Sequence, residues 1–492
     1  MFTVLHSYTK GVNMSYCTPA WRRRPLLSSV LCLVLLETLG AAQLLPPAAA
    51  PLFDGQPFVA AWNVPTGVCQ RLGVALDMAP FQLVTTPAKV VGQPLMLFYS
   101  DRLGLYPRVD AITHSLLHGG IPQRGDLRAS LAKARADIAH YITATTAPGL
   151  AVIDWEDWRP VWERNWGPKS IYRSLSVSHA RQRYPFLSPE QTVRVARRHF
   201  QAAARSYMCA TLSLATKLRP NYQWGYYLYP NCYNYGWEEA GYTGRCPPEV
   251  VQQNDDLGWL WQSSTALFPS VYLTASLGGG SHTALFVRHR VQEAMRTAAL
   301  ARPAAALPVY VYTRPVFVDQ NRRFLSQADL VSCIGESAAA GASGSVLWGA
   351  SASCEALSAY LSSTLGPYVA NVTAAARLCS AVLCQGHGRC LRRRRDTDDH
   401  LHLNPASFSI LRSEGGYLAV GSLTASDLAK LADKFTCQCY AGRSCSSEIS
   451  PEDPGSVWAC YLCLLYVFSC SHMICCLREQ AAYFHQQVCL LN

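Results

Sequence analysis

The stretch Ala151-Val-Ile-Asp-Trp-Glu-Asp-Trp-Arg-Pro160 decides the fold expected for this chain. It opens with three apolar residues, which are typical of a short buried strand, and the strand ends in carboxylates at Asp154 and Glu156. Side chains two positions apart on a strand point to the same face. The sequence therefore predicts that Asp154 and Glu156 project together, with Trp155 and Asp157 directed the other way.

Two adjacent carboxylates raise each other's cost of ionising, so that one of them can stay protonated and serve as a general acid. Cleavage of a glycosidic bond needs this arrangement. The alternative is an ordinary strand end with two solvated acids, because a lone Asp-x-Glu is a weak motif. The rest of the chain has to decide between these interpretations.

Short apolar runs alternate with longer helical stretches from about residue 57 onward. The expected strands are 58–64, 95–99, 151–154, 225–229, 267–272, 309–313 and 345–348. The expected helices are 126–141, 188–217, 286–301 and 327–340, and Ser188-Pro-Glu-Gln191 resembles a capping box at the start of the second. This alternation predicts a parallel sheet with helical crossovers, for which a (β/α) barrel is the simplest closure.

A barrel collects its reactive side chains at the carboxyl ends of its strands. The residues expected there, besides the two carboxylates, are Asn63, Tyr99, Tyr227, Tyr229, Tyr272 and Trp348. Aromatic faces stack on pyranose rings, and phenol hydroxyls donate hydrogen bonds. For any one of these tyrosines alone, core packing is the better explanation, so their shared location carries the interpretation.

The composition indicates a secreted globular protein. Half of the 492 residues are apolar and 15% are charged, and 20 cysteines indicate an oxidising compartment. Three arginines at 22–24 precede an apolar run at 26–39 and small residues at 40–42, which predicts a signal peptide over residues 1–42. An uncleaved signal anchor is the alternative.

The formal charge of +11 suits a polyanionic partner. Removal of the leader lowers it to about +8, and the run Arg392–Arg395 supplies half of that. We expect this run to be a solvated basic loop. No motif for nucleic acid binding is present, and the sequence indicates no cofactor.

A cysteine-rich region follows Pro367 and contains Asn371-Val-Thr373, an acceptor sequence for N-glycosylation. A secretory leader and the cysteine spacings favour disulfides over zinc. Residues 457–476 then form an apolar run without Asp, Glu, Lys or Arg. A transmembrane anchor, a signal for a glycolipid anchor and an aberrant tail remain open for this run.

Several blocks of sequence resemble the animal hyaluronidases, glycoside hydrolase family 56, over about residues 57–445. Besides residues 154–166, the blocks are Phe98-Tyr-Ser-Asp-Arg-Leu-Gly-Leu-Tyr-Pro107, Trp224-Gly-Tyr-Tyr-Leu-Tyr-Pro-Asn-Cys-Tyr-Asn234, Trp259-Leu-Trp261, Ala266-Leu-Phe-Pro-Ser-Val-Tyr272, Gly335-Glu-Ser-Ala338, Leu347-Trp-Gly349 and Gly386-His-Gly-Arg-Cys390. The resemblance implies an α/β fold, a distorted TIM-like barrel followed by a small disulfide-rich EGF-like module. The expected division is a signal region 1–42, a catalytic barrel 43–367, an EGF-like module with an insertion 368–446, and a tail 447–492.

The resemblance also implies the activity: an endo-β-N-acetylhexosaminidase that cuts the β-1,4 bonds of hyaluronan, with chondroitin as a further substrate left open. It gives Glu156 the role of general acid and base, and Asp154 the role of orienting the acetamido group that attacks. The sugar contacts that it implies are Tyr227, Tyr272, Trp348, Tyr99 and Asn63. Arg159 matches either a contact for glucuronate or a structural ion-pair partner, and the second is slightly favoured.

The resemblance further implies a set of disulfides. The pairs are Cys69 with Cys354, Cys232 with Cys246, Cys379 with Cys390, Cys384 with Cys437, and Cys439 with Cys445, the last with an unusually short spacing. Cys209 and Cys333 are expected as buried thiols. The protein is expected to be a monomer of the secretory pathway, either secreted, lysosomal or at the cell surface. A weakly active or inactive hyaluronan-binding adhesion protein is the alternative from another functional class.

Overall fold

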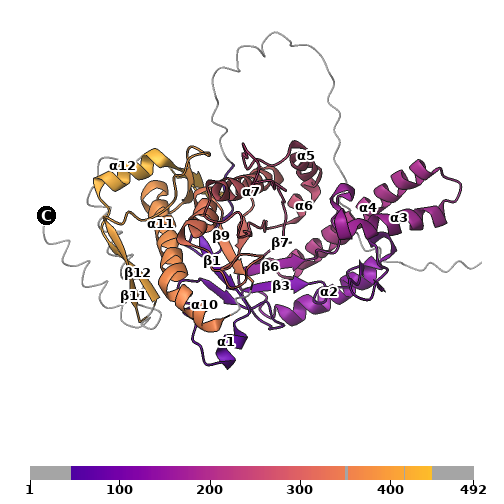
Figure 1. Ribbon diagram of the computed structural model, residues 1–492, viewed down its shortest axis with the longest axis horizontal. Coiled ribbons are helices and arrows are strands. Elements are labelled where there is room, and N and C mark those ends of the chain that lie inside the picture. Colours follow the sequence, from indigo (N-terminus) through magenta and orange to yellow (C-terminus); the bar gives the residue numbers. More distant parts are fainter. Residues whose placement is uncertain (1–45, 350–352, 415, 446–492) are drawn as a thin grey trace, which may run out of the picture.

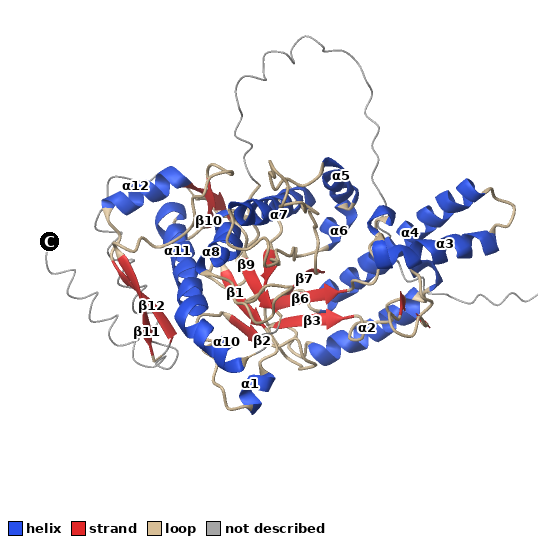
Figure 2. Cartoon of the chain, viewed as in Figure 1, coloured by secondary structure: helices blue, strands red, loops and turns tan. Residues whose placement is uncertain are grey.

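The computed structural model describes residues 46–349, 353–414 and 416–445. The expected signal region 1–42 and the tail 447–492 lie outside the described residues. The strands occupy the centre of the molecule (Figures 1 and 2). Helices α2 (Leu127–Tyr141), α3 (Ser170–Arg183) and α4 (Pro189–Leu218) lie on one side of them, and α10 (Cys354–Tyr360), α11 (Gly366–Cys384) and α12 (Ala425–Lys434) on the other.

Two parallel sheets form the barrel. One sheet has the order β2 (Leu83–Thr85), β1 (Val59–Asn63), β9 (Gly344–Trp348), β8 (Tyr310–Thr313), and the other has the order β3 (Leu95–Tyr99), β6 (Gly149–Asp154), β7 (Tyr222–Tyr226). Single bridges from Phe268 to Tyr227 and from Ser270 to Tyr312 connect β7 to β8 through residues 267–270. The structure is therefore an α/β fold with parallel sheets, as the sequence predicts, and we call these strands together the barrel.

The strand expected at 267–272 is absent as a continuous element, which corrects the prediction. Pro269 has no backbone N–H and interrupts the ladder, so only isolated bridges form around it. The strand expected at 225–229 lies three residues earlier, at Tyr222–Tyr226. Strand β2 was not anticipated, because three residues are too few to give a periodic signal.

Alternate residues of each strand face two apolar clusters. In β6, Leu150 and Val152 belong to the cluster inside the barrel, whereas Ala151 and Ile153 belong to the larger cluster beneath the helices. A strand buried on both faces reads as a continuous apolar run, which is why 151–153 shows no alternation. The inner cluster ends in Tyr99, Tyr227, Tyr272 and Trp348, which pack against it at the carboxyl ends of the strands.

The long helices confirm the sequence pattern. They are α2 (Leu127–Tyr141), α4 (Pro189–Leu218) and α7 (Ser281–Ala301), and Ser188 caps α4 in a capping box with Gln191. The helix expected at 327–340 is a composite of α8 (Gln327–Leu330), a π-helical turn Val331–Gly335 and α9 (Glu336–Ala339). The elements that the sequence did not predict include α1 (Gly67–Arg71), α3 (Ser170–Arg183), α5 (Pro248–Asp256), α6 (Gly258–Ser263) and the short pair β4 (Arg108–Val109) and β5 (Leu116–Leu117).

A continuous helical run follows β9, the last strand of the barrel. It consists of α10 (Cys354–Tyr360), a π-helical turn Leu361–Leu365 and α11 (Gly366–Cys384). Within the described residues it is the one helix long and apolar enough to cross a membrane, but 61% of its apolar window is buried, as for a core helix. The expected domain boundary at residue 367 falls inside α11, so the cysteine-rich region begins as an extension of the barrel.

The region after α11 is folded throughout its described length. Strands β10 (Gly388–Arg392) and β13 (Phe435–Cys439) pair antiparallel, and the insertion between them contains the hairpin β11 (Phe408–Ser413) and β12 (Gly416–Gly421) followed by α12 (Ala425–Lys434). The structure contains the disulfides Cys69–Cys354, Cys232–Cys246, Cys379–Cys390, Cys384–Cys437 and Cys439–Cys445. Cys209 and Cys333 are buried and take part in none of these disulfides.

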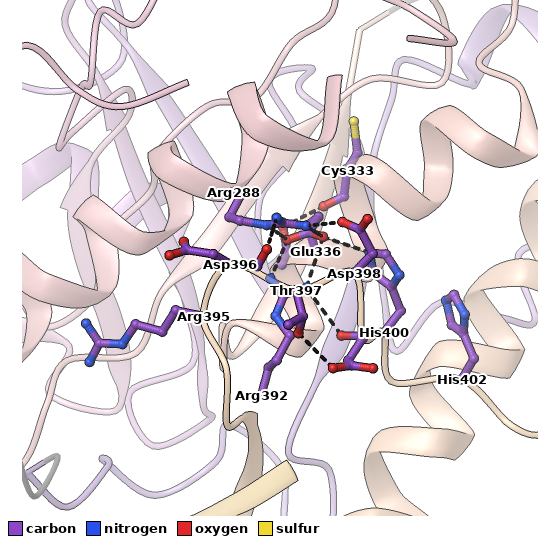
Figure 3. A network of polar contacts seen from close by, with 12 residues as sticks. Arg288, Cys333, Glu336, Arg392, Arg395, Asp396, Thr397, Asp398, His400 and His402 are labelled. Atoms are coloured by element: carbon purple, nitrogen blue, oxygen red, sulfur yellow. Dashed lines mark hydrogen bonds and ion pairs between the residues drawn. The ribbon is translucent and has the colours of Figure 1, made fainter. Parts of the chain in front are cut away.

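A buried ion cluster joins this region to the barrel (Figure 3). Glu336 is fully buried, and its carboxylate accepts hydrogen bonds from Arg288 of α7 and from Arg392 of β10, with shortest distances of 2.8 and 2.6 Å. His400 contacts the same carboxylate at 2.8 Å. The expectation of a solvated loop at 392–395 is therefore wrong for Arg392, whose side chain is 2% exposed because β10 ends against Glu336, while the three arginines after it are exposed.

Asn371 lies within α11 instead of on an exposed loop. Its Oδ1 accepts a hydrogen bond from the Leu403 N–H at 3.2 Å, and the Thr373 hydroxyl is buried and donates to the Val369 carbonyl. A glycan needs an exposed acceptor. The side chain of Asn371 is half-buried, and its glycosylation stays a prediction.

Candidate active site

Asp154 is the last residue of β6, and Glu156 follows it by two positions. Between them, Trp155 turns outward and is buried in the outer cluster, where its ring stacks on Tyr106 with a centroid separation of 4.6 Å. This anchor fixes the backbone at the point where the strand ends. Within the described residues, neither carboxylate is ion paired with a protein side chain, so both remain available to a ligand.

Burial, together with the charges of Glu156 and Asp157, raises the pKa of Asp154 to about 8. Removal from water also raises the pKa of Glu156, although its side chain reaches solvent, and Lys169 and Arg159 oppose that rise. The pair therefore carries a proton at mildly acidic and neutral pH. The pKa of Glu156 is likewise above the ordinary value, so Glu156 keeps a proton at a higher pH than a solvated glutamate does.

An aromatic wall stands beside the carboxylates. The rings of Tyr272 and Trp348 are parallel within 8°, with centroids 6.0 Å apart, and the Trp348 Nε1–H donates to the Tyr99 hydroxyl at 3.1 Å. Tyr99 is the direct neighbour of Asp154 across β3 and β6. The parallel strands thus bring Tyr99, Asp154 and Trp348, which lie far apart in the sequence, to one end of the barrel.

The hydroxyls of Tyr227 and Tyr272 are buried donors. Burial raises the pKa of both groups well above the ordinary value, so they stay protonated at all physiological pH values. The Tyr227 hydroxyl donates weakly to Ser270 Oγ at 3.4 Å. The Tyr272 hydroxyl is buried and interacts with the Tyr227 hydroxyl. A phenol hydroxyl can both donate and accept, so this pair can also bond to a ligand.

Asn63 lies deeper than the other predicted residues. It is fully buried at the end of β1, beside Trp348 of β9, and its Nδ2 donates to Thr85 Oγ1 at 2.7 Å. Its buried Oδ1 has no partner within the described residues. The structure therefore places Asn63 beneath the aromatic wall.

Arg159 contacts aromatic rings and a backbone carbonyl. Its guanidinium lies 5.1 Å from the Trp166 ring centroid and 5.6 Å from that of Tyr233, and it donates to the Arg164 carbonyl at 3.0 Å. In the part of the chain that the structure describes, no carboxylate pairs with it. The structural role that the sequence favours thus depends on cation–π contacts instead of an ion pair.

Sequence reasoning missed Arg314, which follows β8 directly. Its guanidinium lies 5.7 Å from the Tyr272 ring centroid and 5.6 Å from that of Trp348. Gly349 leaves room for it, because a Cβ there would lie 2.9 Å from Arg314 Nε. The rule that active residues follow barrel strands would have found Arg314 had it been applied to β8 as well.

No group of three or more His, Cys, Asp or Glu side chains able to hold a metal ion occurs within the described ranges. The carboxylate pair can perform acid–base chemistry, assisted by the phenol hydroxyls. Two carboxylates and an aromatic wall at the carboxyl end of a parallel barrel define a glycosidase.

Sequence comparison identifies the family. The family model described as hyaluronidase matches residues 47–449, and the chain belongs to this family. It is similar to hyaluronidase PH-20 of Macaca fascicularis, with 43% identity over 84% of this chain and 82% of that protein. It is also similar to hyaluronidase-2 of Homo sapiens, with 45% identity over 84% of this chain and 90% of the relative.

A solved structure agrees with this assignment. The crystal structure of bee venom hyaluronidase in complex with a hyaluronic acid tetramer aligns with a TM-score of 0.57 and 31% identity, covering 63% of this chain and 98% of that one. The recognition of the family from the blocks around residues 98, 154 and 224 is thereby confirmed.

Proposed function

We propose that this enzyme hydrolyses the β-1,4 bonds of hyaluronan by a retaining mechanism in which the substrate's own acetamido group is the nucleophile. The observation that carries the proposal is the carboxylate pair Asp154 and Glu156 beside the stacked rings of Tyr272 and Trp348. The bee venom relative, solved with a hyaluronic acid tetramer, supports the substrate class.

In the first step, Glu156 donates its proton to the glycosidic oxygen. The acetamido oxygen attacks the anomeric carbon while the bond to the leaving group breaks, giving an oxazolinium intermediate. In the second step, Glu156 takes a proton from water, which opens this intermediate at the same face and retains the configuration. The scheme departs from the two-carboxylate mechanism because no second carboxylate becomes a nucleophile.

Asp154 stabilises the positive charge of the intermediate. Its raised pKa makes the ionised form costly in the empty site. A positive charge on the acetamido group lowers that cost, so the attraction is strongest in the transition state. Tyr227 and Tyr272 donate hydrogen bonds to the reacting sugar, Trp348 packs under it, and Tyr99 fixes Trp348.

The test is reducing-end release from hyaluronan by the secreted chain and by Glu156→Gln. Loss of a general acid is expected to lower kcat by about 10² to 10⁴-fold with hyaluronan binding retained. Glu163→Gln is the matched control, because Glu163 pairs with Arg197 on the surface at 2.8 Å, outside the site. Equal turnover by Glu156→Gln and wild type would contradict the proposed mechanism.

Two other functions have distinct outcomes in the same assay. Turnover of chondroitin, with less or none of hyaluronan, would assign the chain to chondroitin as its substrate. Binding of hyaluronan by wild type without turnover of either polymer would favour the adhesion protein. The intact carboxylate pair favours the hydrolase.

We further propose that residues 43–367 provide the catalytic barrel and that residues 368–446 are an EGF-like module, whose first two cysteines come from the barrel's last helix. Five disulfides support the secretory pathway as the location, because such bonds persist in oxidising compartments. A monomer that is secreted, lysosomal or held at the cell surface by the tail is compatible with this location.

A further inference from the structure

A row of four aromatic rings extends from the carboxylate site over the surface. Its members are Trp166, Tyr233, Tyr235 and Trp237. Successive ring centroids are 6.2, 6.4 and 6.1 Å apart. We call this set the aromatic row.

The row leaves much of its aromatic surface in water. The side chain of Trp166 is 51% exposed and that of Tyr235 is 54% exposed, whereas most aromatic rings in the described part of the chain are buried. Contiguous exposed aromatic surface marks a binding site more often than a structural one. Flat rings with polar edges suit carbohydrate, which is apolar on its ring faces and polar around them.

The segment that carries three of these rings is held rigidly without regular secondary structure. Tyr233 has a left-handed backbone with φ of 51°, and its N–H donates to Asn231 Oδ1 at 2.9 Å. Asn234 Nδ2 donates to the Gly244 carbonyl at 2.6 Å, and Cys232 is bonded to Cys246. A left-handed non-glycine residue costs free energy and persists where its surroundings impose it. The rings are thus preorganised, which lowers the entropy cost of binding.

The row begins on the side of the general acid. Arg159 lies between Trp166 and Tyr233, and its positive charge acts on Glu156, where it opposes the rise in pKa that burial causes. The wall of Tyr272 and Trp348 is connected instead to Asp154, through Tyr99. A general acid lies next to the glycosidic oxygen, which departs with the leaving half of the chain. Sugars that continue past Glu156 therefore belong to the leaving half of the chain.

We propose that the aromatic row binds the leaving half of an anionic polysaccharide, beyond the sugars held at the carboxylates. This inference rests on the proposed function. Arg159 supplies the positive charge at the start of the row. Glu238 and Glu239, directly after Trp237, are exposed and repel a polyanion, so the contact ends there.

The experiment compares two substrates in the secreted, full-length protein. Hyaluronan polymer has sugars on both sides of the cut, whereas a 4-nitrophenyl glycoside of a hyaluronan tetrasaccharide has no sugar on the leaving side. The double variant Trp166→Ala and Tyr235→Ala is expected to lose about tenfold in kcat/KM on the polymer, since a stacked ring is worth about 0.5–1.5 kcal/mol. On the nitrophenyl glycoside it should equal wild type.

Two further variants separate binding from folding. Trp166→Phe with Tyr235→Phe keeps the rings and should restore most of the loss on the polymer. Phe186→Ala removes a ring that is 80% exposed outside the row, and should alter neither substrate. An equal loss on both substrates, or a loss on neither, would overturn the proposal. If wild type cuts neither substrate, the proposed function fails, and the Kd of each variant for hyaluronan still decides whether the row binds the polymer.

Discussion

Asp154 lies where its ionised form is poorly hydrated. The free-energy cost of ionising it there contributes to its role in the reaction. The residue ends a buried strand, and Glu156 adds negative charge nearby. Its pKa in the folded protein is about 8, against 3.8 for the ordinary side chain. In an unfolded chain the group ionises freely. Between these two values the folded protein binds more protons than the unfolded one, so stability falls as pH rises.

The variant Asp154→Asn should therefore be more stable than wild type at pH 8 and nearly equal to it at about pH 4. The expected gain at pH 8 is about 2 kcal/mol or more, because each unit of pKa shift corresponds to about 1.4 kcal/mol and partial exposure of Asp154 to solvent reduces the sum over the whole shift. Urea unfolding at both pH values measures it, and activity should fall at both. Equal stability of the two proteins at pH 8 would contradict the burial argument.

The common face of Asp154 and Glu156 was predictable because side-chain alternation on a strand is a local property. The balance of their pKa values was not, because it depends on Lys169 and Arg159, which follow Glu156 by 13 and 3 residues and approach it only in the fold. Arg314 could have been found from its position directly after β8. The link between Trp166 and Tyr233 in the aromatic row could not, because it joins two segments that lie far apart in the sequence.

At the scale of elements, the long helices were predicted best, because the signals that mark them are local. The box Ser188-Pro-Glu-Gln191 located the start of α4 to the residue, because capping is a contact within one turn. Elements that depend on neighbours were harder to predict. Pro269 interrupts the expected strand at 267–272. The sequence also did not predict that α10 and α11 continue through the expected domain boundary.

Removal of the cap should cost stability without touching the chemistry. Ser188 Oγ accepts from the Gln191 N–H, and Gln191 Oε1 accepts from the Ser188 N–H. Ser188→Ala should lower the free energy of unfolding by about 1 kcal/mol and leave kcat on hyaluronan unchanged. The control is Ser206→Ala, on an exposed position inside α4, which should be neutral or slightly stabilising because alanine favours helices. Similar losses in both variants would refute a specific capping effect.

At the scale of the whole molecule, Glu336 is the buried charge that links the cysteine-rich region to the barrel. Its carboxylate connects α7 with β10 and with His400 of the insertion, so three parts of the chain share one buried charge (Figure 3). The sequence offered Gly335-Glu-Ser-Ala338 only as a block typical of the family. Its physical role was unpredictable, since Arg288 and Arg392 are 48 residues before it and 56 after it.

Glu336→Gln should destabilise the protein by about 3–5 kcal/mol at pH 7, because it leaves Arg392 buried without a counter-charge and leaves Arg288 with only the exposed carboxylate of Asp398. Hydrogen bonds from His400, Arg288 and Arg392 hold the pKa of Glu336 far below its ordinary value of 4.5. The unfolded chain therefore takes up a proton near pH 4.5 while the folded protein does not. The contribution of Glu336 is complete above that pH and decreases below it.

Wild type should thus lose about 1.4 kcal/mol more than Glu336→Gln for each pH unit below 4.5. The measurement is urea unfolding of both proteins at pH 7, 4.5 and 3.5. Asp398→Asn is the matched control, because Asp398 contacts the same Arg288 but its side chain is 82% exposed, and it should cost at most about 1 kcal/mol. If both variants cost the same at pH 7, the charge at Glu336 does not hold the two regions together. In that case the disulfides and the shared apolar core alone must do so.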